Sequence, residues 1–304
     1  MKRMPLIFLL VGLLGFSGAA NAFDVDFSRD DVDTLFEAGR EALPERVDGL
    51  VRLPSRLSTR ALPVVGGKKY KLEIAAETSG DFVVETNDRA HVLTLQSPGN
   101  QLSSTYEVSF QNAAGDDIRG LEGVTPGGRA WLGGFFLTNQ RQPYVAVFYA
   151  PPDAASLKVR FQSNSRTTHI ASLHLVEETE EKTVNPNPDF RYGELNYAGW
   201  RPARDGRIYT RPDGKRVLHL GYGGVSPIFP LSPERTYRIS ATGEGKPLNI
   251  EYFDKDGKPL LQRFLIRLSS KGEETDMVPP AGTVMARVSA LGAIIEEFKV
   301  VQVK

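Results

Sequence analysis

Residues suited to catalysis are sparse in this 304-residue chain. It has no cysteine, so a thiolate nucleophile is excluded, and its four histidines (His91, His169, His174 and His219) form no recognised metal-ligand motif. Neither the G-x-S-x-G nucleophile elbow nor the H-E-x-x-H zinc motif occurs. We therefore expect a protein that binds rather than one that catalyses a reaction.

Acidic residues offer the remaining route to catalysis, because glycan cleavage needs two carboxyl groups on either side of one bond. Glu251 lies near Asp254, but Asp254 falls at an expected turn. Glu296 and Glu297 are adjacent on an expected strand and so face opposite sides of it. A hydrolase or lyase stays open only if acids from other segments converge in a cleft.

The run Asp254–Gly257 (DKDG) is similar to the start of a calcium-binding loop. The later ligands and the final glutamate of such a loop are missing. We expect a β-hairpin turn at this position instead.

Charge is balanced, with 37 basic and 37 acidic residues. A balanced chain does not attract nucleic acid over a long range, so no nucleic-acid partner is expected. Lys158, Arg160 and Arg166 could meet an acidic polymer. The first two alternate with apolar residues, however, which is typical of an ordinary solvated strand face.

The first residues have the pattern of a secretory signal. Lys2 and Arg3 precede an apolar run at Leu6–Phe16, and small residues ending in Ala20-Asn21-Ala22 supply a cleavage site. The sequence predicts a signal peptide over residues 1–22, cleaved after Ala22, and a periplasmic or secreted mature protein without disulfides. The apolar run is too short to span a bilayer and no later run is long enough, so no membrane span is expected.

Residues 23–48 are expected to form a strand and a helix that pack on the first β domain. FDVDF at Phe23–Phe27 alternates like a strand. Ser28 and Asp31 fit a capping box for a helix that ends near Leu43, before Pro44. An alternative is that this helix docks a partner.

Alternating apolar residues and Gly-rich turns predict strands over most of the remaining chain. In the first domain they are expected at Leu50–Leu53, Tyr70–Ala75, Phe82–Glu85, His91–Leu95, Tyr106–Phe110, Ala130–Leu137, Tyr144–Tyr149, Leu157–Phe161 and Ile170–Val176. Residues 178–188 are polar, lack apolar periodicity and contain two Asn-Pro steps, which is typical of a linker.

The plan of Leu62–Glu77 returns at Phe229–Glu244. Each copy opens with an apolar-Pro-apolar step, passes a polar turn and continues into an alternating strand with one apolar face. Further matches follow in the same order: Val108 and Phe110 with Ile250 and Tyr252, Leu157, Val159 and Phe161 with Val284, Ala286 and Val288, and Ile170, Leu173 and Leu175 with Ile295, Phe298 and Val300. We therefore expect an all-β chain of two tandem β-sandwich or jelly-roll domains, residues 49–177 and 189–304, with one short N-terminal helix.

The start of the second domain carries a family resemblance. Asn185-Pro186-Asn187-Pro188-Asp189-Phe190 is followed by Tyr192-Gly193 and Gly199-Trp200, and the chain closes with IIEEFKVVQV. This order resembles carbohydrate-binding modules with the galactose-binding-like jelly-roll fold. The resemblance covers the second domain, whereas the first shares only its later strands.

The resemblance implies a structural calcium ion near the domain start and a paired-acid step in the last strand. Asp189, Glu194 and Glu296 are the matching oxygen ligands. The paired acids are Glu296-Glu297 in the second copy, but the first copy has Ala171-Ser172. No other cofactor is implied.

Modules of this family bind sugars on aromatic faces, and the resemblance therefore points to Trp131, Tyr149, Trp200 and Tyr222. Trp131 and Tyr222 lie in Gly-rich stretches where a loop could approach a ligand. Trp200 sits where the family packs an aromatic into its own sandwich, so a core position is its alternative. The expected function is non-catalytic binding of a polysaccharide or cell-surface glycan. The alternative is a structural or partner-binding protein of the cell envelope, which an exposed apolar edge strand would favour.

Overall fold

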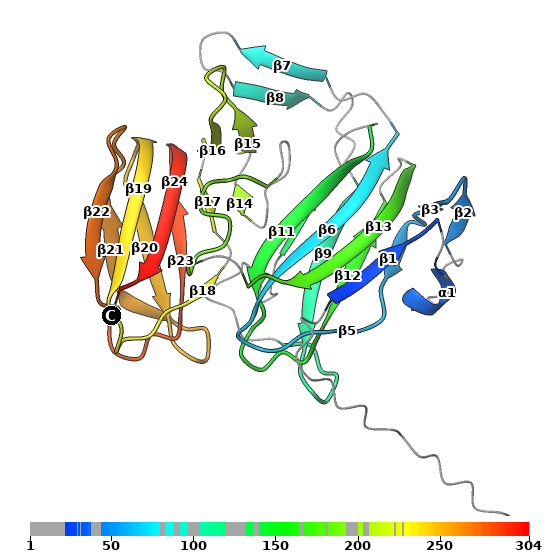
Figure 1. The fold of residues 1–304 in the computed structure, drawn as a ribbon, viewed down its shortest axis with the longest axis horizontal. Coiled ribbons are helices and arrows are strands. Elements are labelled where there is room, and N and C mark those ends of the chain that lie inside the picture. Colours follow the sequence, from blue (N-terminus) through cyan, green and yellow to red (C-terminus); the bar gives the residue numbers. More distant parts are fainter. Residues whose placement is uncertain are drawn as a thin grey trace, which may run out of the picture.

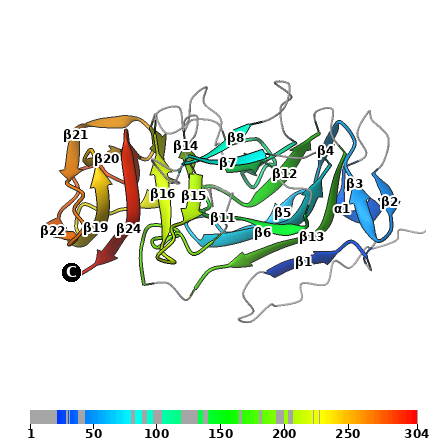
Figure 2. The same ribbon diagram turned by 90° about the horizontal axis from the view of Figure 1, so that it is seen from above.

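The computed structural model describes residues 22–28, 30, 32–37, 44–79, 83–87, 92–96, 104–118, 132–135, 140–163, 167–179, 182–192, 200–202, 207–221, 223–226 and 228–303. These residues form an all-β fold of two sandwiches placed side by side (Figures 1 and 2). The helix α1 (Val32–Leu35) is the single helix among them. Within the described ranges, no helix has the length and apolar character needed to cross a membrane.

The first sandwich consists of two facing sheets. One sheet has the order β11 (Gln142–Tyr149), β6 (Lys69–Thr78), β13 (Thr168–Glu177), β3 (Leu50–Arg52) and β2 (Glu45–Val47), with β1 (Ala22–Asp26) also paired to β13. The other has the order β10 (Leu132–Phe135), β9 (Thr105–Gln111), β12 (Ser156–Gln162) and β4 (Arg56–Ser58), with β5 (Leu62–Pro63) also paired to β12. The strands β7 (Val83–Asn87) and β8 (Val92–Gln96) pair with each other.

The second sandwich has the same construction. One sheet has the order β14 (Arg201–Pro202), β17 (Gly224–Val225), β23 (Met285–Ala290), β20 (Leu248–Phe253) and β21 (Pro259–Ile266), with β18 (Phe229–Pro230) also paired to β23. The other has the order β15 (Arg207–Thr210), β16 (Arg216–Leu220), β24 (Ala293–Gln302), β19 (Tyr237–Gly245) and β22 (Glu273–Met277).

The core of each sandwich follows from the alternation of its central strands. Tyr70, Leu72 and Ile74 of β6 are fully buried. Ile239 and Ala241 of β19, the equivalents of Leu72 and Ile74, are fully buried as well. Since successive side chains of a strand point to opposite faces, one apolar residue in two is enough to cover the inner face of a sheet.

The two sandwiches repeat each other down to single hydrogen bonds. In the first sandwich β5 pairs with β12 and β6 pairs with β13. In the second sandwich the equivalent strands pair in the same way, β18 with β23 and β19 with β24. At the start of the repeated segment the Val65 N–H donates to the Tyr70 hydroxyl at 2.8 Å. The Ser232 N–H donates to the Tyr237 hydroxyl at 3.0 Å in the second copy. The predicted repeat is therefore present in the fold.

One predicted match within the repeat is displaced by two residues. Leu62 pairs with Leu157, and its equivalent Phe229 pairs with Ala286. Leu157 therefore corresponds to Ala286, and not to Val284 as the sequence suggested. A shift of two residues keeps every side chain on the same face, so the apolar pattern alone could not detect it.

The DKDG run is a hairpin turn, as predicted. The Asp254 Oδ1 accepts the backbone N–H groups of Asp256 and Lys258, each at 2.9 Å. Asn112 accepts two backbone N–H groups in the same way at the equivalent turn of the first sandwich. The Asp254 carboxylate thus stabilises the turn.

The predicted helix is shorter than the sequence suggested, because it ends at Leu35. Phe36 pairs with Thr59 in an isolated β-bridge, and the Glu37 N–H donates to the Ser58 carbonyl at 2.9 Å. Phe36 is buried, with its ring stacked on that of Phe27. Burial of this ring outweighs the weak preference of the segment for helix. Residues 38–43 lie outside the described ranges.

The paired tyrosine hydroxyls give a test of the repeat. We expect Tyr70→Phe and Tyr237→Phe each to lower the free energy of unfolding by about 1 kcal/mol, since each leaves a backbone N–H without its partner. Urea denaturation measures both changes. Tyr192→Phe, whose partly exposed hydroxyl contacts Glu178 at 3.4 Å, is the control and should have a smaller effect. A loss of stability in only one of the Tyr70→Phe and Tyr237→Phe variants would contradict the prediction that the two tyrosine hydroxyls have equivalent roles.

Candidate functional site

The structure places Trp200 in the core of the second sandwich. Its side chain is 1% exposed, and its ring lies edge-on to that of Phe190 with centroids 5.7 Å apart. Trp200 thus takes the core position that the sequence offered as its alternative, and it presents no ring face to a ligand. Trp131 and Tyr222 lie outside the described residues.

Tyr149 lies where the two sandwiches meet. Its ring packs against the core of the second sandwich, and the Lys69 ammonium lies 5.8 Å from the ring centroid. Burial raises the pKa of the Tyr149 phenol. This tyrosine helps to join the two sandwiches, and its ring does not form an open platform.

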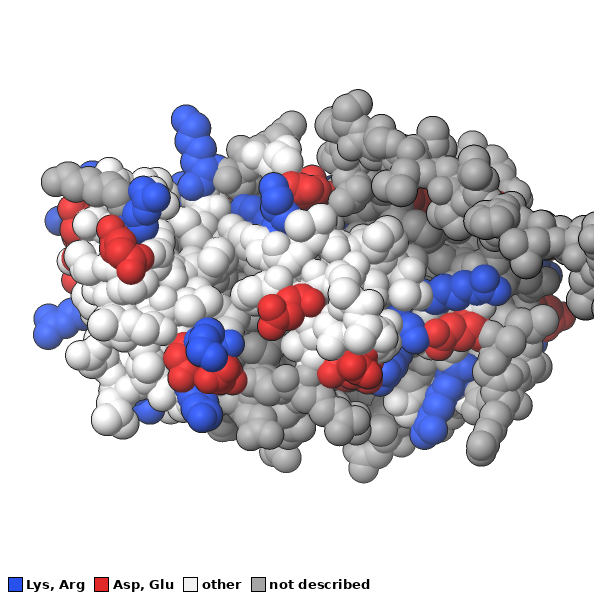
Figure 3. All heavy atoms as spheres, turned by 90° about the horizontal axis from the view of Figure 1, so that it is seen from below, with Lys and Arg blue, Asp and Glu red and all other residues white. Residues whose placement is uncertain are grey.

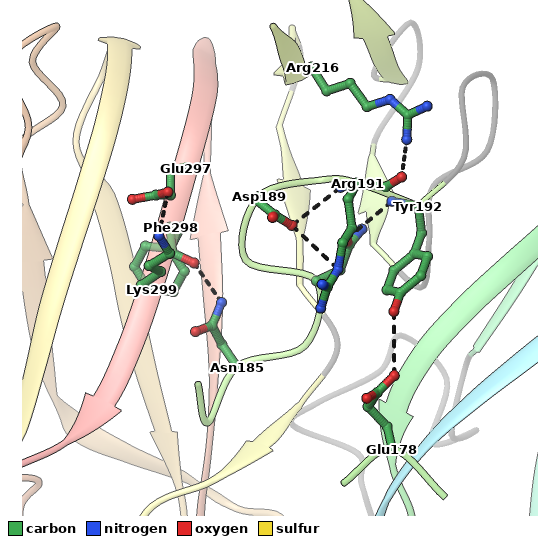
Figure 4. A network of polar contacts seen from close by, with 10 residues as sticks. Glu178, Asn185, Asp189, Arg191, Tyr192, Arg216, Glu297, Phe298 and Lys299 are labelled. Carbon is green, nitrogen blue, oxygen red and sulfur yellow. Dashed lines mark hydrogen bonds and ion pairs between the residues drawn. The ribbon is translucent and has the colours of Figure 1, made fainter. Parts of the chain in front are cut away.

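The segment 182–188 that connects the sandwiches is fixed along β24. The Val184 N–H donates to the Val300 carbonyl at 2.7 Å. The Asn185 amide nitrogen donates to the Phe298 carbonyl at 2.7 Å, and its oxygen accepts the Val300 N–H at 2.7 Å. Figure 4 shows Asn185 pointing at Phe298. These bonds give the polar connecting segment a fixed position against the second sandwich.

Charged and aromatic side chains complete this seam between the sandwiches, which we define by Lys69, Lys71, Glu178, Arg191 and Tyr192. The Tyr192 hydroxyl donates to Glu178 at 3.4 Å (Figure 4), and the Lys71 ammonium lies 5.5 Å from the Tyr192 ring centroid. The Lys69 ammonium donates to the Thr183 carbonyl at 3.2 Å. Burial lowers the pKa of Lys69 to about 8, with Glu178 opposing and Arg191 adding to the shift.

Two of the three predicted calcium ligands, Glu296 and Asp189, lie beside basic side chains. Glu296 is held by Arg211 at 2.6 Å and Lys215 at 3.1 Å, while Asp189 lies 3.8 Å from the Arg191 guanidinium. Glu194 lies outside the described residues. Within the described ranges, no three histidine or acidic side chains gather as a metal would need.

A polar pocket opens at one end of the first sandwich, with a volume of about 390 Å³. Three carboxylates, Asp24, Asp26 and Asp48, line it together with Arg141 and His174. We call it the bulge pocket, because Ala171, the bulged residue of β13, forms part of its wall.

Three local features create the bulge pocket. Ala171 has no partner in the β6–β13 ladder, and its carbonyl accepts the Phe27 N–H at 3.0 Å, next to the last β1–β13 pair, Asp26 and Ser172. The β2–β3 hairpin turns at Asp48-Gly49, where both residues have positive φ, 51° and 76°. This Asp-Gly turn brings the Asp48 carboxylate to the pocket. Ala171 is small, so the space beside it stays open.

The second sandwich has its bulge at the equivalent position of β24, where Glu296 is the residue without a ladder partner. Its long side chain is bound by Arg211 and Lys215. The same backbone feature therefore supports a pocket in the first sandwich and an ion-pair cluster in the second.

The bulge pocket combines hydrogen-bond acceptors with donors. The Ser28 N–H and hydroxyl donate to the Asp26 Oδ1 at 2.9 and 2.6 Å, so this carboxylate is held in position. The His174 Nδ1 contacts the Asp24 carboxylate. Arg141 lies 3.5 Å from Glu77, half exposed at the edge of the pocket. Such a set suits a neutral ligand with many hydroxyl groups better than a single ion, because charges of both signs are present.

Sequence reasoning did not find this pocket. Asp24 and Asp26 are two residues apart on a predicted strand and so share a face, which is the one available signal. Arg141 and His174 come from distant parts of the chain, and only the sheet order brings them together.

On the face seen in Figure 3, acidic and basic side chains are interspersed among the described residues.

Comparison with known proteins identifies no family. No protein-family model matches the chain, and no curated protein matches it. Among solved structures, apo BiXyn10A CBM1 is 14% identical, covering 51% of this chain and 97% of its own at a TM-score of 0.29. The CBM22-1–CBM22-2 tandem domain of Paenibacillus barcinonensis Xyn10C is 10% identical, and the match covers 96% of this chain and 100% of that domain at a TM-score of 0.29. Allantoicase from Saccharomyces cerevisiae is 9% identical, and the match covers 93% of this chain and 89% of the allantoicase chain at a TM-score of 0.26. At such TM-scores these likenesses carry no argument about function.

The burial of Lys69 in the seam predicts that its contribution to the free energy of unfolding depends on pH. Below pH 8 its ammonium is charged in both the folded and unfolded chain, so the cost of burying the charge is fully present. Between about 8 and 10.5 the folded chain loses the proton first, and stability rises with pH. We expect the free energy of unfolding of the unchanged chain to rise over this range relative to Lys69→Met.

Urea denaturation of the two proteins at a series of pH values across this range measures the difference. A difference that stays constant with pH would show that Lys69 has no lowered pKa in the folded protein.

Proposed function

We propose that this protein binds carbohydrate without modifying it, and that the bulge pocket is a binding site. The observation that carries the proposal is the gathering of Asp24, Asp26 and Asp48 with Arg141 and His174 around one cavity. Its volume of about 390 Å³ falls within the range of roughly 300–1,000 Å³ typical of small-ligand sites.

The chemistry of the lining supports a sugar as the ligand. Each sugar hydroxyl both donates and accepts a hydrogen bond. Carboxylates such as Asp26 and Asp48 accept bonds, whereas the Arg141 guanidinium donates them, and bonds to charged groups are stronger than those between neutral groups. A polyhydroxylated ligand can satisfy both kinds of group at once.

The site of action is part of the proposal. Residues 2–22 have the pattern of an export signal, so we propose a periplasmic or secreted location and a polysaccharide or cell-surface glycan as partner. A structural calcium ion in the second sandwich belongs to the same proposal, through the family resemblance of its first residues.

A glycan array probed with the chain from Phe23 to Lys304, with and without calcium, is the first experiment. We expect selective binding to one glycan class, followed by titration of that glycan in solution. Loss of binding on chelation would support the calcium ion. Absence of binding to every glycan would overturn the proposed function.

Two variants then locate the site. Asp48→Asn keeps a residue that tolerates positive φ and removes the charge, and Arg141→Met removes a donor at an exposed position. We expect each to weaken binding by roughly tenfold or more, as for the loss of a charge-assisted hydrogen bond. Arg238→Met, which breaks an exposed ion pair with Asp276 on the second sandwich, is the matched control. Binding that is unaffected by both pocket variants would place the glycan elsewhere.

The second candidate function is that of an envelope scaffold that binds other chains. One observation favours it: β21 is an edge strand with exposed apolar side chains, Leu261 and Leu265. Exposed apolar edges of this kind mark interaction surfaces.

A further inference from the structure

The strand β21 and the residue after it present exposed side chains in which leucine alternates with arginine. Phe264 and Ile266 point inward to the core of the second sandwich. Successive side chains of a strand point to opposite faces, so the residues between and beside them point to solvent. Leu261 is 101% exposed and Leu265 is 66% exposed. We call the outward set the Leu-Arg row: Leu261, Arg263, Leu265 and Arg267.

The backbone of β21 is protected against pairing with a further strand. Its ladder with β20 is regular from Leu248–Ile266 to Glu251–Arg263, and it resumes only at Phe253 and Pro259. Residues 260–262 therefore form a bulge, and both a bulge and a proline protect an edge from strand addition. An occupant of this face must contact the side chains of the Leu-Arg row.

The segment that carries the row has an excess of positive charge. Residues 257–272 contain four basic residues and no acidic residue, in a chain with equal totals of both. All four are exposed, and within the described residues none of them has an ion-pair partner. They are Lys258, Arg263, Arg267 and Lys271.

Acidic groups close to the row are already engaged. Glu251 lies opposite Arg263 on β20, but it accepts a hydrogen bond from the Arg287 Nε at 2.7 Å. In the β20–β21 turn Asp256 pairs with Lys255 at 3.2 Å. The acidic residues of β22 belong to the facing sheet. The positive charge of the row is therefore left for a partner outside the chain.

We propose that the Leu-Arg row docks on the surface of a membrane that contains anionic lipids. The two leucines enter the boundary between headgroups and acyl chains, while the arginines reach the lipid phosphates with their long side chains. Lys258 and Lys271, at the two ends of the segment, add attraction to the negative surface.

A lipid surface fits this face better than other acidic partners do. It offers apolar and anionic groups side by side, as alternating leucine and arginine require, and it needs no backbone hydrogen bonds from a protected edge. A soluble acidic polymer would leave both leucines in water. In Figures 1 and 2 β21 lies at the end of the molecule remote from the first sandwich, so a flat surface has access to it.

Vesicle co-sedimentation tests the proposal, using the chain from Phe23 to Lys304, which lacks the apolar run Leu6–Phe16. The vesicles consist of phosphatidylcholine alone or of phosphatidylcholine with about a quarter phosphatidylglycerol. We expect binding to the mixed vesicles and little to the neutral ones. Binding should weaken as salt is raised, because salt screens the attraction.

Two double variants separate the apolar from the charged contribution. Leu261→Asn with Leu265→Asn should weaken binding to the mixed vesicles by roughly tenfold, because the apolar contact is lost. Arg263→Gln with Arg267→Gln should weaken it by roughly tenfold or more and reduce its dependence on salt.

The controls are exposed residues of the same kinds on the first sandwich. Val65→Asn and Arg52→Gln should leave vesicle binding unchanged. All variants should unfold at nearly the same urea concentration as the unchanged chain, since the substituted side chains lie in solvent. This comparison shows that any lost binding does not come from unfolding.

Each outcome decides the proposal. Absence of binding to the mixed vesicles overturns it. Loss of binding in the arginine variant but not in the leucine variant also overturns it, and leaves the face to a soluble acidic partner. Glycan binding at the bulge pocket lies on the other sandwich and should be the same in all these variants. Failure of the membrane proposal therefore leaves the proposed function untouched, and the reverse holds as well.

Discussion

The structure depends on one constraint, the burial of a single face of the long central strands β6 and β19. Each carries an apolar side chain at every second position, and each lies between two partners, β11 and β13 in one sandwich and β22 and β24 in the other. A slip of one residue would turn the whole apolar face to solvent, so burial fixes the register of the sheet. The tyrosines at Tyr70 and Tyr237 add a fixed point, since each hydroxyl binds a backbone N–H five residues before it. Hairpins, edges and the bulge pocket are positioned relative to these two strands.

The sequence was sufficient for most of the fold and for little of the site. Alternation located the strands and the repeat, because strand formation in these segments follows local pattern. The two-residue displacement at Leu157 arose because that pattern is unchanged by a shift of two. The helix after Ser28 was overestimated because the burial of Phe36 is a long-range effect that helical periodicity does not contain. The bulge pocket depends on Arg141 and His174 meeting Asp24 and Asp48, and only the order of strands in space determines that meeting.

The connection between the sandwiches shows how a polar segment can be structural. Its composition is that of a linker, yet Asn185 is buried and satisfies two backbone groups of β24 with one amide. The neighbouring Lys69 is held against Tyr149 and the Thr183 carbonyl. Each of these contacts replaces hydration by a specific partner, which is the condition under which polar groups can be buried. The seam is therefore a packed junction built from polar groups.

The bulge shared by β13 and β24 lets the two sandwiches differ in sequence at a position that leaves their fold the same. A bulged residue stands outside the ladder, so its side chain can be exchanged without disturbing the pairing on either side. Ala171 in one half and Glu296 in the other occupy this same position with entirely different chemistry. The repeated sandwich thus contains a position at which the surface chemistry can differ while the core stays the same.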